Sequence, residues 1–330
     1  MTADAFRGRR VLVTGGLGFI GSNLARRLVE AGAEVLLVDS MIPEYGGSVA
    51  NIAGIEDEVT VNIADVRDVH SLPYLVGDCE VIFSLAGQTS HLDSMADPYT
   101  DLEINCRAQL SLLEACRLVN PDARIVFAST RQIYGRPEYL PVDERHPINP
   151  VDVNGINKTA GEWYHLLYGQ VYGIPVCVLR LTNTYGPRMR VKDARQTFLG
   201  YWLRQIVAGE EISVFGDGLQ KRDFNYVDDA VDAFLLAATR DEAIGKTYNL
   251  GDSEVINLLD LARKLVELNG DGLFKVVPFP EDRKAIDIGD YYSDFTRINA
   301  DLGWQPRVGL DEGLQRSIDF YREHGSSYWP

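Results

Sequence analysis

The sequence predicts a doubly wound parallel α/β fold with a smaller C-terminal domain. Three observations support this fold class: β-branched apolar runs alternate with amphipathic helical stretches, the runs lack polar–apolar alternation, and a glycine-rich turn follows the first run. Strands of this kind, separated by helices, form a parallel sheet that helices cover on both faces. We place the first domain at residues 1–179, with segments near 224–251 returning to it, and the smaller domain at residues 180–330.

The expected elements follow in order along the chain. Apolar residues predominate in the expected strands, which are Arg10–Thr14, Glu34–Asp39, Val59–Ile63, Val81–Leu85, Arg124–Ser129 and Val176–Leu181. Helices are expected at Gly21–Ala31, Tyr99–Val119 and Gly155–Tyr172. After Arg180 glycine and proline become frequent and the elements become shorter. A helix at Asp228–Thr239 and a strand at Thr247–Gly251 are expected to return to the first domain.

Composition and charge narrow the class of partner. The 330 residues carry a net charge of −16, so nucleic acid and anionic membranes are not expected as general partners. No apolar run approaches the ~20 residues that a membrane-spanning helix needs, and the N-terminus lacks a signal-peptide apolar region. The four cysteines lack metal-ligand spacing and are expected to be reduced thiols, with no metal bound. These observations predict a cytoplasmic protein.

A glycine-rich turn between the first strand and the first helix predicts a dinucleotide-binding site. Gly15 permits the tight turn, Gly18 lets the backbone approach a pyrophosphate, and Gly21 allows close packing of the helix. The N-terminus of that helix presents free N–H groups to the phosphates. Asp39 ends the next strand, where its carboxylate can bind both ribose hydroxyls and would repel a 2′-phosphate. The sequence therefore predicts NAD, rather than NADP, as the cofactor.

Motifs along almost the whole chain resemble the extended short-chain dehydrogenase/reductase family, and within it the nucleotide-sugar epimerases and dehydratases. In chain order the motifs are TGGLGFIGS at 14–22, LAG at 85–87, Asn105, ST at 129–130, YG at 134–135, RLTNTYGP at 180–187, FGDG at 215–218, RDF at 222–224, YVDD at 226–229 and LGW at 302–304. The resemblance implies a Rossmann-type fold that oxidises a sugar hydroxyl with NAD+, acts on the ketone and returns the hydride. With Asp65 and Val66 after the third strand, the expected NAD contacts are Gly15, Gly18, Phe19, Ile20, Gly21, Asp39, Ser40, Asp65, Val66, Leu85, Ala86, Gly87 and Lys158.

The catalytic residues that the resemblance implies are only partly present. In the family a Ser or Thr orients the sugar hydroxyl, a Tyr takes its proton, and a Lys holds the nicotinamide ribose. Thr130 and Lys158 match two of these positions, whereas Asn154, which does not ionise, replaces the tyrosine four residues before the lysine. Three explanations are compatible with Asn154. Either Lys158 or His91 replaces the base, or the chain binds NAD and a nucleotide sugar with little turnover, or Asn154 is an introduced, inactivating substitution.

The residues after Thr130 bear on the reaction. The resemblance implies Asp-Glu here in dehydratases and Glu in related decarboxylases, but this chain has Arg131 and Gln132. We therefore expect epimerisation, at sugar C4 through a transient keto-sugar, ahead of dehydration or decarboxylation. Tyr134 and Tyr164 are expected to pack in the core and not to replace the missing base.

The expected substrate is a nucleotide-diphosphate sugar. The resemblance implies a diphosphate contact for Arg222, a phosphate or sugar contact for Asn183, and a nucleobase contact for Phe215. A second diphosphate arginine of the family is replaced by Asp287, which leaves Arg283 or Arg188 as candidates for its role. The substrate-binding set is therefore Thr130, Asn183, Phe215, Arg222 and Arg283.

The resemblance also implies a homodimer built from two helices of each chain. These are the helices at Asp101–Val119 and Gly155–Tyr172, which carry apolar residues on partly matching faces. The residues are Leu110, Leu113, Trp163, Leu166 and Leu167. The alternative is that the two helices only cover the sheet.

Overall fold

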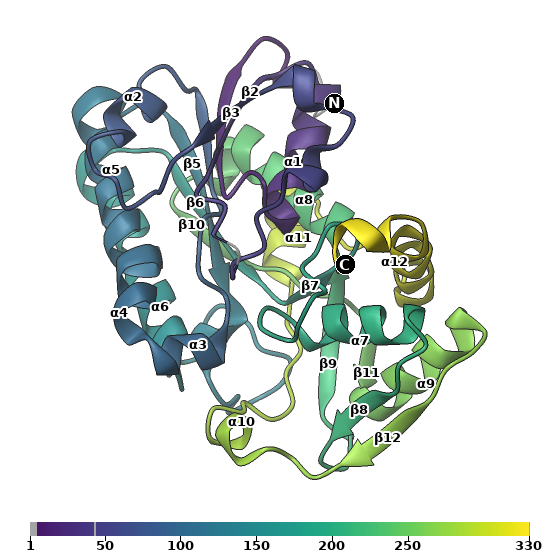
Figure 1. Ribbon diagram of the computed structural model, residues 1–330. Helices are drawn as coiled ribbons and strands as arrows, with labels where there is room; N and C mark the ends of the chain where they lie inside the picture. The colour runs from purple at the N-terminus through teal and green to yellow at the C-terminus, as the bar shows by residue number, and fades with distance from the viewer. Residues whose placement is uncertain (1–4, 43, 330) are drawn as a thin grey trace.

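The structure is a computed structural model that describes residues 5–42 and 44–329. Figure 1 shows two lobes, an upper one built on a sheet between two layers of helices and a lower one of shorter elements. Within the described residues, no helix combines the length and the apolar character that crossing a bilayer requires.

Seven parallel strands make up the central sheet. They are β1 (Arg10–Thr14), β2 (Glu34–Asp39), β3 (Val59–Ile63), β4 (Val81–Ser84), β5 (Arg124–Thr130), β6 (Val176–Leu181) and β10 (Lys246–Asn249). Their order is β10-β6-β5-β4-β1-β2-β3. Six of them follow the strand order typical of dinucleotide-binding folds, and β10 extends the sheet beside β6. The fold class predicted from the sequence is confirmed.

Helices cover both faces of this sheet. On one face lie α1 (Phe19–Glu30) and α8 (Val227–Thr239), and on the other α2 (Leu72–Val76), α5 (Ala108–Val119) and α6 (Val153–Tyr172). Successive residues of a strand point to opposite faces, so Val11 and Val13 pack in one apolar cluster and Leu12 in the other. Burial on both faces explains why the strands show no polar–apolar alternation. The exception is β3, an edge strand that is largely exposed.

Helix boundaries differ from the predicted ones where caps and turns intervene. The expected helix at Tyr99–Val119 consists of α4 (Pro98–Leu102), a π-helical turn (Glu103–Arg107) and α5. Two helices begin two residues earlier than expected, α1 at Phe19 and α6 at Val153. The start of α6 is fixed by Asp152, whose carboxylate accepts the N–H of Gly155 at 2.7 Å. Asn154 therefore lies in the first helical turn, on the same side as Lys158.

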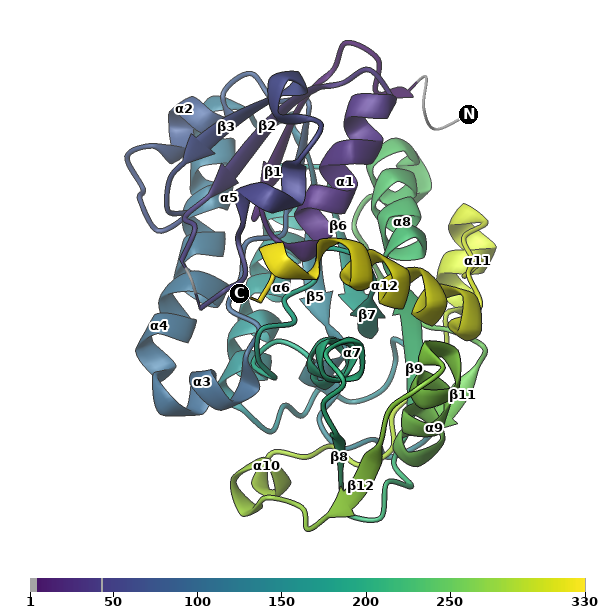
Figure 2. The ribbon, with the colours of Figure 1, turned by 45° about the vertical axis from the view of Figure 1, so that its right-hand side comes forward.

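The lower lobe covers the carboxyl edge of the sheet. Its strands are β7 (Asn183–Tyr185), β9 (Lys221–Tyr226) and β11 (Val255–Asn257) in one small sheet, and β8 (Ile212–Phe215) and β12 (Phe274–Val277) in another. Its helices are α7 (Phe198–Val207), α9 (Leu258–Asn269), α10 (Glu281–Ala285) and α12 (Leu310–His324). Two helices outside it are α11 (Thr296–Leu302), which packs against β10, and α3 (His91–Ala96), which follows β4. Figure 2 shows α12 between the helices of the upper lobe and α7.

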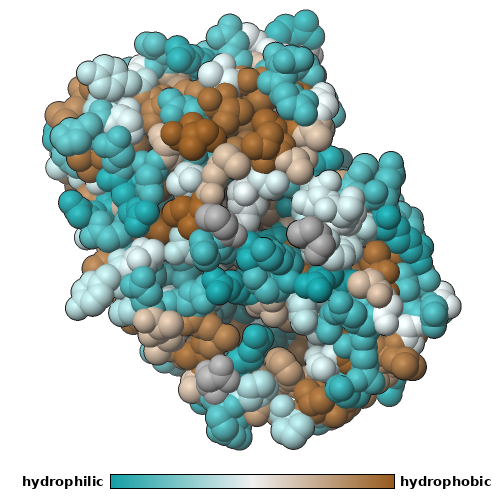
Figure 3. All heavy atoms as spheres, viewed as in Figure 1, coloured by the Kyte–Doolittle hydropathy of each residue, from teal (hydrophilic) through white to brown (hydrophobic). Residues whose placement is uncertain are grey.

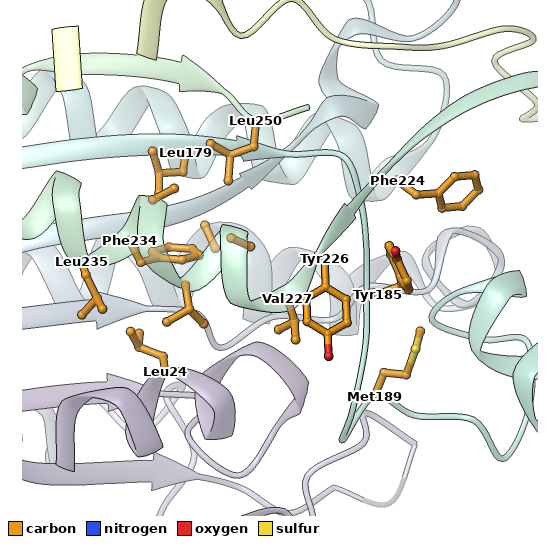
Figure 4. Packing of buried hydrophobic residues seen from close by; sticks show 14 of the residues in the cluster. Leu24, Leu179, Tyr185, Met189, Phe224, Tyr226, Val227, Phe234, Leu235 and Leu250 are labelled. Carbon is orange, nitrogen blue, oxygen red and sulfur yellow. The ribbon is translucent and has the colours of Figure 1, made fainter. Parts of the chain in front are cut away.

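One continuous apolar core joins the two lobes. It runs from Leu24 of α1 and Phe234 of α8 to the aromatic residues of β7 and β9. Figure 4 shows Tyr185, Phe224 and Tyr226 packed together at the lobe boundary, and the rings of Tyr185 and Phe224 are 6.2 Å apart. This shared core holds the lower lobe over the edge of the sheet.

Candidate active site

A cleft of about 470 Å³ lies between the lobes, where β1, β2, β4 and β5 end. Hydrophilic residues dominate the surface where the two lobes meet (Figure 3). Every residue that the sequence analysis assigns to cofactor, catalysis or substrate lines this one cleft. They are Gly15, Gly18, Phe19, Ile20, Gly21, Asp39, Ser40, Asp65, Val66, Leu85, Ala86, Gly87, His91, Thr130, Asn154, Lys158, Asn183, Phe215, Arg222 and Arg283.

The glycine turn has the shape that a pyrophosphate requires. Gly15 has φ of +70°, and a Cβ atom there would lie 3.0 Å from the backbone nitrogen of Ala86. A Cβ atom on Gly21 would lie only 2.2 Å from the carbonyl oxygen of Gly15. Gly18 caps α1 without any side-chain hydrogen bond, so the first N–H groups of the helix are left for a ligand.

Two backbone N–H groups hold the carboxylate of Asp39 in place at the end of β2. Its Oδ2 accepts the N–H of Leu17 at 3.1 Å, and its Oδ1 accepts the N–H of Met41 at 2.8 Å. Burial raises the pKa of Asp39, and these two hydrogen bonds oppose the rise. A 2′-phosphate would meet a carboxylate that is fixed from two sides, whereas ribose hydroxyls can donate to it. The turn and this carboxylate together fit NAD.

Asn154 belongs to a buried polar network below the cleft. Its side chain is buried, and Nδ2 donates to the carbonyl oxygen of Gln88 at 2.8 Å and to Oδ2 of Asp101 at 3.0 Å. Asn105 donates to the same two oxygens at the same distances, and Asn157 donates to Oδ1 of Asp101 at 2.8 Å. Three amides therefore surround one fully buried carboxylate. Asn154 is an integral member of this network.

Thr130 and Lys158 approach the cleft from β5 and α6. The hydroxyl oxygen of Thr130 accepts the N–H of Gln132 at 3.2 Å. Lys158 is buried, and its Nζ donates to the carbonyl oxygen of Ala128 at 3.2 Å. Burial lowers the pKa of Lys158 to about 8, with the charge of Asp101 opposing the effect. Lys158 can thus lose its proton near physiological pH.

His91 faces the cleft beside a buried carboxylate. Its Nδ1 lies 2.9 Å from Oδ2 of Asp152, although the angle is outside hydrogen-bond geometry. Such catalytic contacts are often poorly aligned until substrate binds. Burial raises the pKa of Asp152, but the contact with His91 and the hydrogen bonds from Gly155 and Gln132 together outweigh burial. The pKa of Asp152 is therefore below its usual value, and the ionised form is favoured.

The substrate side of the cleft contains arginines. Arg222 is buried, its Nη1 donates to the carbonyl oxygens of Lys221 and Gly289, and its Nη2 lies 3.7 Å from Oδ1 of Asp287. Burial lowers the pKa of Arg222 to about 10.

Of the two candidates for the second diphosphate arginine, only one reaches the cleft. The guanidinium of Arg283 lies 5.4 Å from the ring centroid of Phe215, and both residues line the cleft. Arg188 instead donates to Oδ1 of Asn23 at 2.8 Å and packs on the ring of Phe320. Arg188 therefore lies outside the described cleft lining, and the role of the missing arginine stays a prediction for Arg283.

Tyr134 and Tyr164 lie outside the cleft, as expected. The hydroxyl of Tyr134 donates to Oδ1 of Asn249 at 2.6 Å, and Tyr164 packs against the apolar cluster on the α5 and α6 side of the sheet. Neither tyrosine takes the place that Asn154 occupies.

Three site residues escaped the sequence analysis. Arg131 and Gln132 were considered only as replacements for carboxylates, yet both line the cleft. Asp152 was not singled out, although an aspartate directly before a helical pattern is a recognisable N-cap signal. Its contact with His91, by contrast, joins positions 61 residues apart and has no local signature.

The strand order, the glycine turn and the carboxylate at the end of β2 define a Rossmann-type dinucleotide-binding protein, with a second lobe over the cleft. Residues 11–251 match the model of the NAD dependent epimerase/dehydratase family. The chain belongs to this family, and its cofactor is NAD.

Known relatives of the chain catalyse more than one reaction. The chain is 32% identical to a putative UDP-glucose 4-epimerase of Methanocaldococcus jannaschii, over 95% of this chain and 99% of the relative. It is 31% identical to UDP-glucuronic acid decarboxylase 1 of Xenopus tropicalis, over 96% of this chain and 72% of the relative. The crystal structure of UDP-glucose 4-epimerase from Thermotoga maritima with UDP-glucose superposes with a TM-score of 0.87, at 30% identity, covering 95% and 99% of the two chains.

Proposed function

We propose that this protein is a nucleotide-sugar 4-epimerase that inverts sugar C4 through a transient keto-sugar and uses His91 as its base. The observation that carries the proposal is the placement of His91, backed by the buried carboxylate of Asp152, in the same cleft as Thr130 and Lys158. This pair supplies a proton acceptor where the family's tyrosine is replaced by Asn154.

Each residue then has a defined task. NAD+, when bound, supplies the hydride acceptor that turns a sugar hydroxyl into a ketone, and the hydride is afterwards returned to the same carbon. Thr130 binds the hydroxyl, and His91 takes its proton through Nε2 while Asp152 holds the Nδ1 side of the ring. Lys158 holds the nicotinamide ribose, and Asn154 fixes the floor of the cleft.

The carboxylates of the cleft favour epimerisation over elimination. Among the described lining residues, the carboxylates are Asp39, Asp65 and Asp287. Asp39 closes the ribose end of the cofactor site, Asp65 is paired with Arg67 at 2.6 Å, and Asp287 lies beside Arg222. Arg131 and Gln132, which follow Thr130, have no carboxyl group to act as acid or base. None of the described lining carboxylates follows Thr130, and Asp152, which lies behind His91 and Gln132, is outside the described lining.

The network around Asn154 supports an asparagine that is native to this chain. An asparagine introduced in place of tyrosine would not be expected to find a carboxylate and a carbonyl already positioned for its amide. Asn154 donates to both Asp101 and Gln88, in parallel with Asn105. This complementarity favours a natural asparagine over an introduced, inactivating substitution.

The proposed assembly is a cytoplasmic homodimer. Trp163 and Leu167 of α6 are 58% and 49% exposed, and Leu118 of α5 is 66% exposed, which leaves an apolar stripe on these two helices. A second copy can cover the stripe by the same helices. Leu113, expected in the interface, is instead fully buried against the sheet. The free cysteines, three of them buried, fit a reducing compartment.

Substitution of the proposed base tests the function directly. The NAD-loaded protein is incubated with UDP-, dTDP-, GDP- and CDP-hexoses, and epimers are followed by NMR as a function of pH. We expect His91→Asn to lower kcat by about 10²–10⁴-fold. Asp152→Asn, which keeps a side-chain oxygen to cap α6, should lower kcat and change its pH profile.

The matched control is His70→Asn, because His70 is an exposed histidine away from the cleft. It should retain the wild-type rate. A wild-type rate in His91→Asn would remove His91 as the base. Tight binding of one nucleotide sugar without any epimer would favour the binding protein.

A further inference from the structure

One nitrogen of the Arg131 guanidinium is buried and has no hydrogen-bond partner among the described residues. The residue directly follows Thr130 at the end of β5 and lines the cleft. Its Nη2 donates to Oδ1 of Asn183 at 2.9 Å, and its guanidinium lies 5.2 Å from the ring centroid of Tyr291. Its Nη1 is buried and has no hydrogen-bond partner among the residues the structure describes. A buried guanidinium N–H without an acceptor is costly, which indicates that a ligand supplies one.

A second arginine, Arg222, lies nearby: it forms a β-bridge with Tyr291, the residue whose ring lies beside the Arg131 guanidinium, and both arginines line the cleft. The charge of Arg131 adds to burial in lowering the pKa of Arg222, so the two guanidinium groups repel each other. Among the described residues, no carboxylate forms a hydrogen bond or an ion pair with Arg131, whose hydrogen-bond partner is Asn183. Asp223 accepts hydrogen bonds from a threonine hydroxyl and a backbone N–H, and Asp287 is 3.7 Å from Arg222 while accepting a bond from Gln220. An anionic group between the two arginines would relieve this repulsion.

We propose that Arg131 and Arg222 bind one anionic group of the substrate, so that Arg131, and not Arg283, is the second cation in place of the family arginine that Asp287 replaces. The proposal rests on the proposed function and deepens it by identifying what the cleft binds besides the reacting sugar carbon. Two sources share the required chemistry of paired anionic oxygens, namely the diphosphate of the nucleotide sugar and a carboxylate on the sugar. Arg131 contacts Asn183 and neighbours Arg222, which together favour the diphosphate.

Calorimetric titration of the NAD-saturated protein separates the two sources. The probes are UDP, UDP-glucose and UDP-glucuronate, and the variant is Arg131→Gln. If the diphosphate is bound, the variant weakens all three probes by a similar factor, about 10–100-fold. If a sugar carboxylate is bound, only UDP-glucuronate is weakened. Either result supports the anion site.

Arg145→Gln is the control, because it removes the same charge from a side chain that is 90% exposed and paired with Asp143. It should change none of the affinities by more than twofold. Arg131→Lys keeps the positive charge but lacks the planar guanidinium, which can donate two hydrogen bonds to one anion. Its affinity should therefore lie between those of Arg131→Gln and the wild type. Wild-type affinity of Arg131→Gln for all three probes would overturn the proposal.

Inorganic pyrophosphate provides a readout that does not depend on the proposed function. It should raise the thermal midpoint of the NAD-saturated wild-type protein, and the rise should be lost in Arg131→Gln. If pyrophosphate binds but no nucleotide sugar does, the anion site stands and the epimerase proposal fails. If pyrophosphate stabilises Arg131→Gln as much as the wild type, the anion site itself is refuted.

Discussion

At the scale of single residues, burial changes the chemistry of Lys158 most clearly. Its pKa falls to about 8 from the 10.5 of a free lysine because the side chain is enclosed by protein. Between these two pH values the unfolded chain binds a proton that the folded chain does not, so stability rises with pH across this window. Below pH 8 both states carry the proton, and the buried charge costs about 3 kcal/mol.

Replacing Lys158 by methionine should therefore stabilise the apo protein. We expect Lys158→Met to raise the free energy of unfolding at pH 7 by up to about 3 kcal/mol, and the gain to shrink as the pH approaches 10.5. Denaturant unfolding at pH 7, 9 and 10.5 measures this difference. Lys275→Met, at an exposed lysine, should show no comparable pH dependence. A gain that is constant with pH would mean that Lys158 is not titrating in this range.

Asn154 shows the limit of prediction at this scale. The sequence reveals that the tyrosine position holds an amide, and the chemistry of an amide excludes it as a base. It does not reveal Asp101 and Gln88 as partners, because these residues come from separate segments and meet only in the folded chain. The same holds for His91 and Asp152, whose contact depends on how α3 packs against the start of α6.

At the scale of elements, the glycine turn before α1 is the feature on which the cofactor site depends most. A Cβ atom on Gly21 would lie 2.2 Å from the carbonyl oxygen of Gly15. This oxygen belongs to the backbone, so it cannot move aside as the end of a flexible side chain could. We expect Gly21→Ala to push α1 away from the turn, to weaken NAD binding by at least tenfold and to destabilise the fold by about 1–3 kcal/mol.

NAD titration and thermal unfolding of the same preparations check this expectation. The control is Gly309→Ala, because a Cβ atom at Gly309 meets nothing within 4 Å and its φ of −62° suits alanine. Its NAD affinity should equal that of the wild type. Unchanged NAD affinity in Gly21→Ala would show that the turn does not bind the pyrophosphate.

Local rules predict most elements but not their ends. The apolar runs identify the strands of the sheet because burial on both faces leaves a strong signal. The ends depend on capping and packing: α6 begins at Val153 because Asp152 accepts the N–H of Gly155. The π-helical turn at Glu103–Arg107 interrupts an otherwise continuous helix. The spacing of apolar residues in this segment does not predict the turn.

At the scale of the whole molecule, the exposed apolar stripe on α5 and α6 predicts self-association. Two charges placed in the stripe, Trp163→Asp with Leu167→Asp, should shift the protein from dimer to monomer in size-exclusion chromatography with light scattering. Tyr74→Asp, at a residue that is 86% exposed on α2, is the control and should leave the dimer intact. A wild-type monomer at micromolar concentration would contradict the proposed assembly.

The sequence predicts the site residues that belong to local motifs. It does not predict the contacts that form where the two lobes meet. The predicted cofactor contacts reach the cleft because the carboxyl ends of parallel strands converge at one edge. The set of arginines facing that edge depends instead on the path of the lower lobe, which turns Arg188 away and brings Arg131 beside Tyr291.

Proton NMR of the reaction in D2O tests the central claim most directly. With the correct nucleotide sugar, removal and return of a hydride at C4 predicts that the C4 epimer accumulates with protium at C4 and no deuterium at C5. Deuterium at C5, a 6-deoxy-4-keto product or a pentose product would show elimination or decarboxylation instead. Deuterium at C4, or no epimer from any sugar that binds tightly, would contradict the epimerase account.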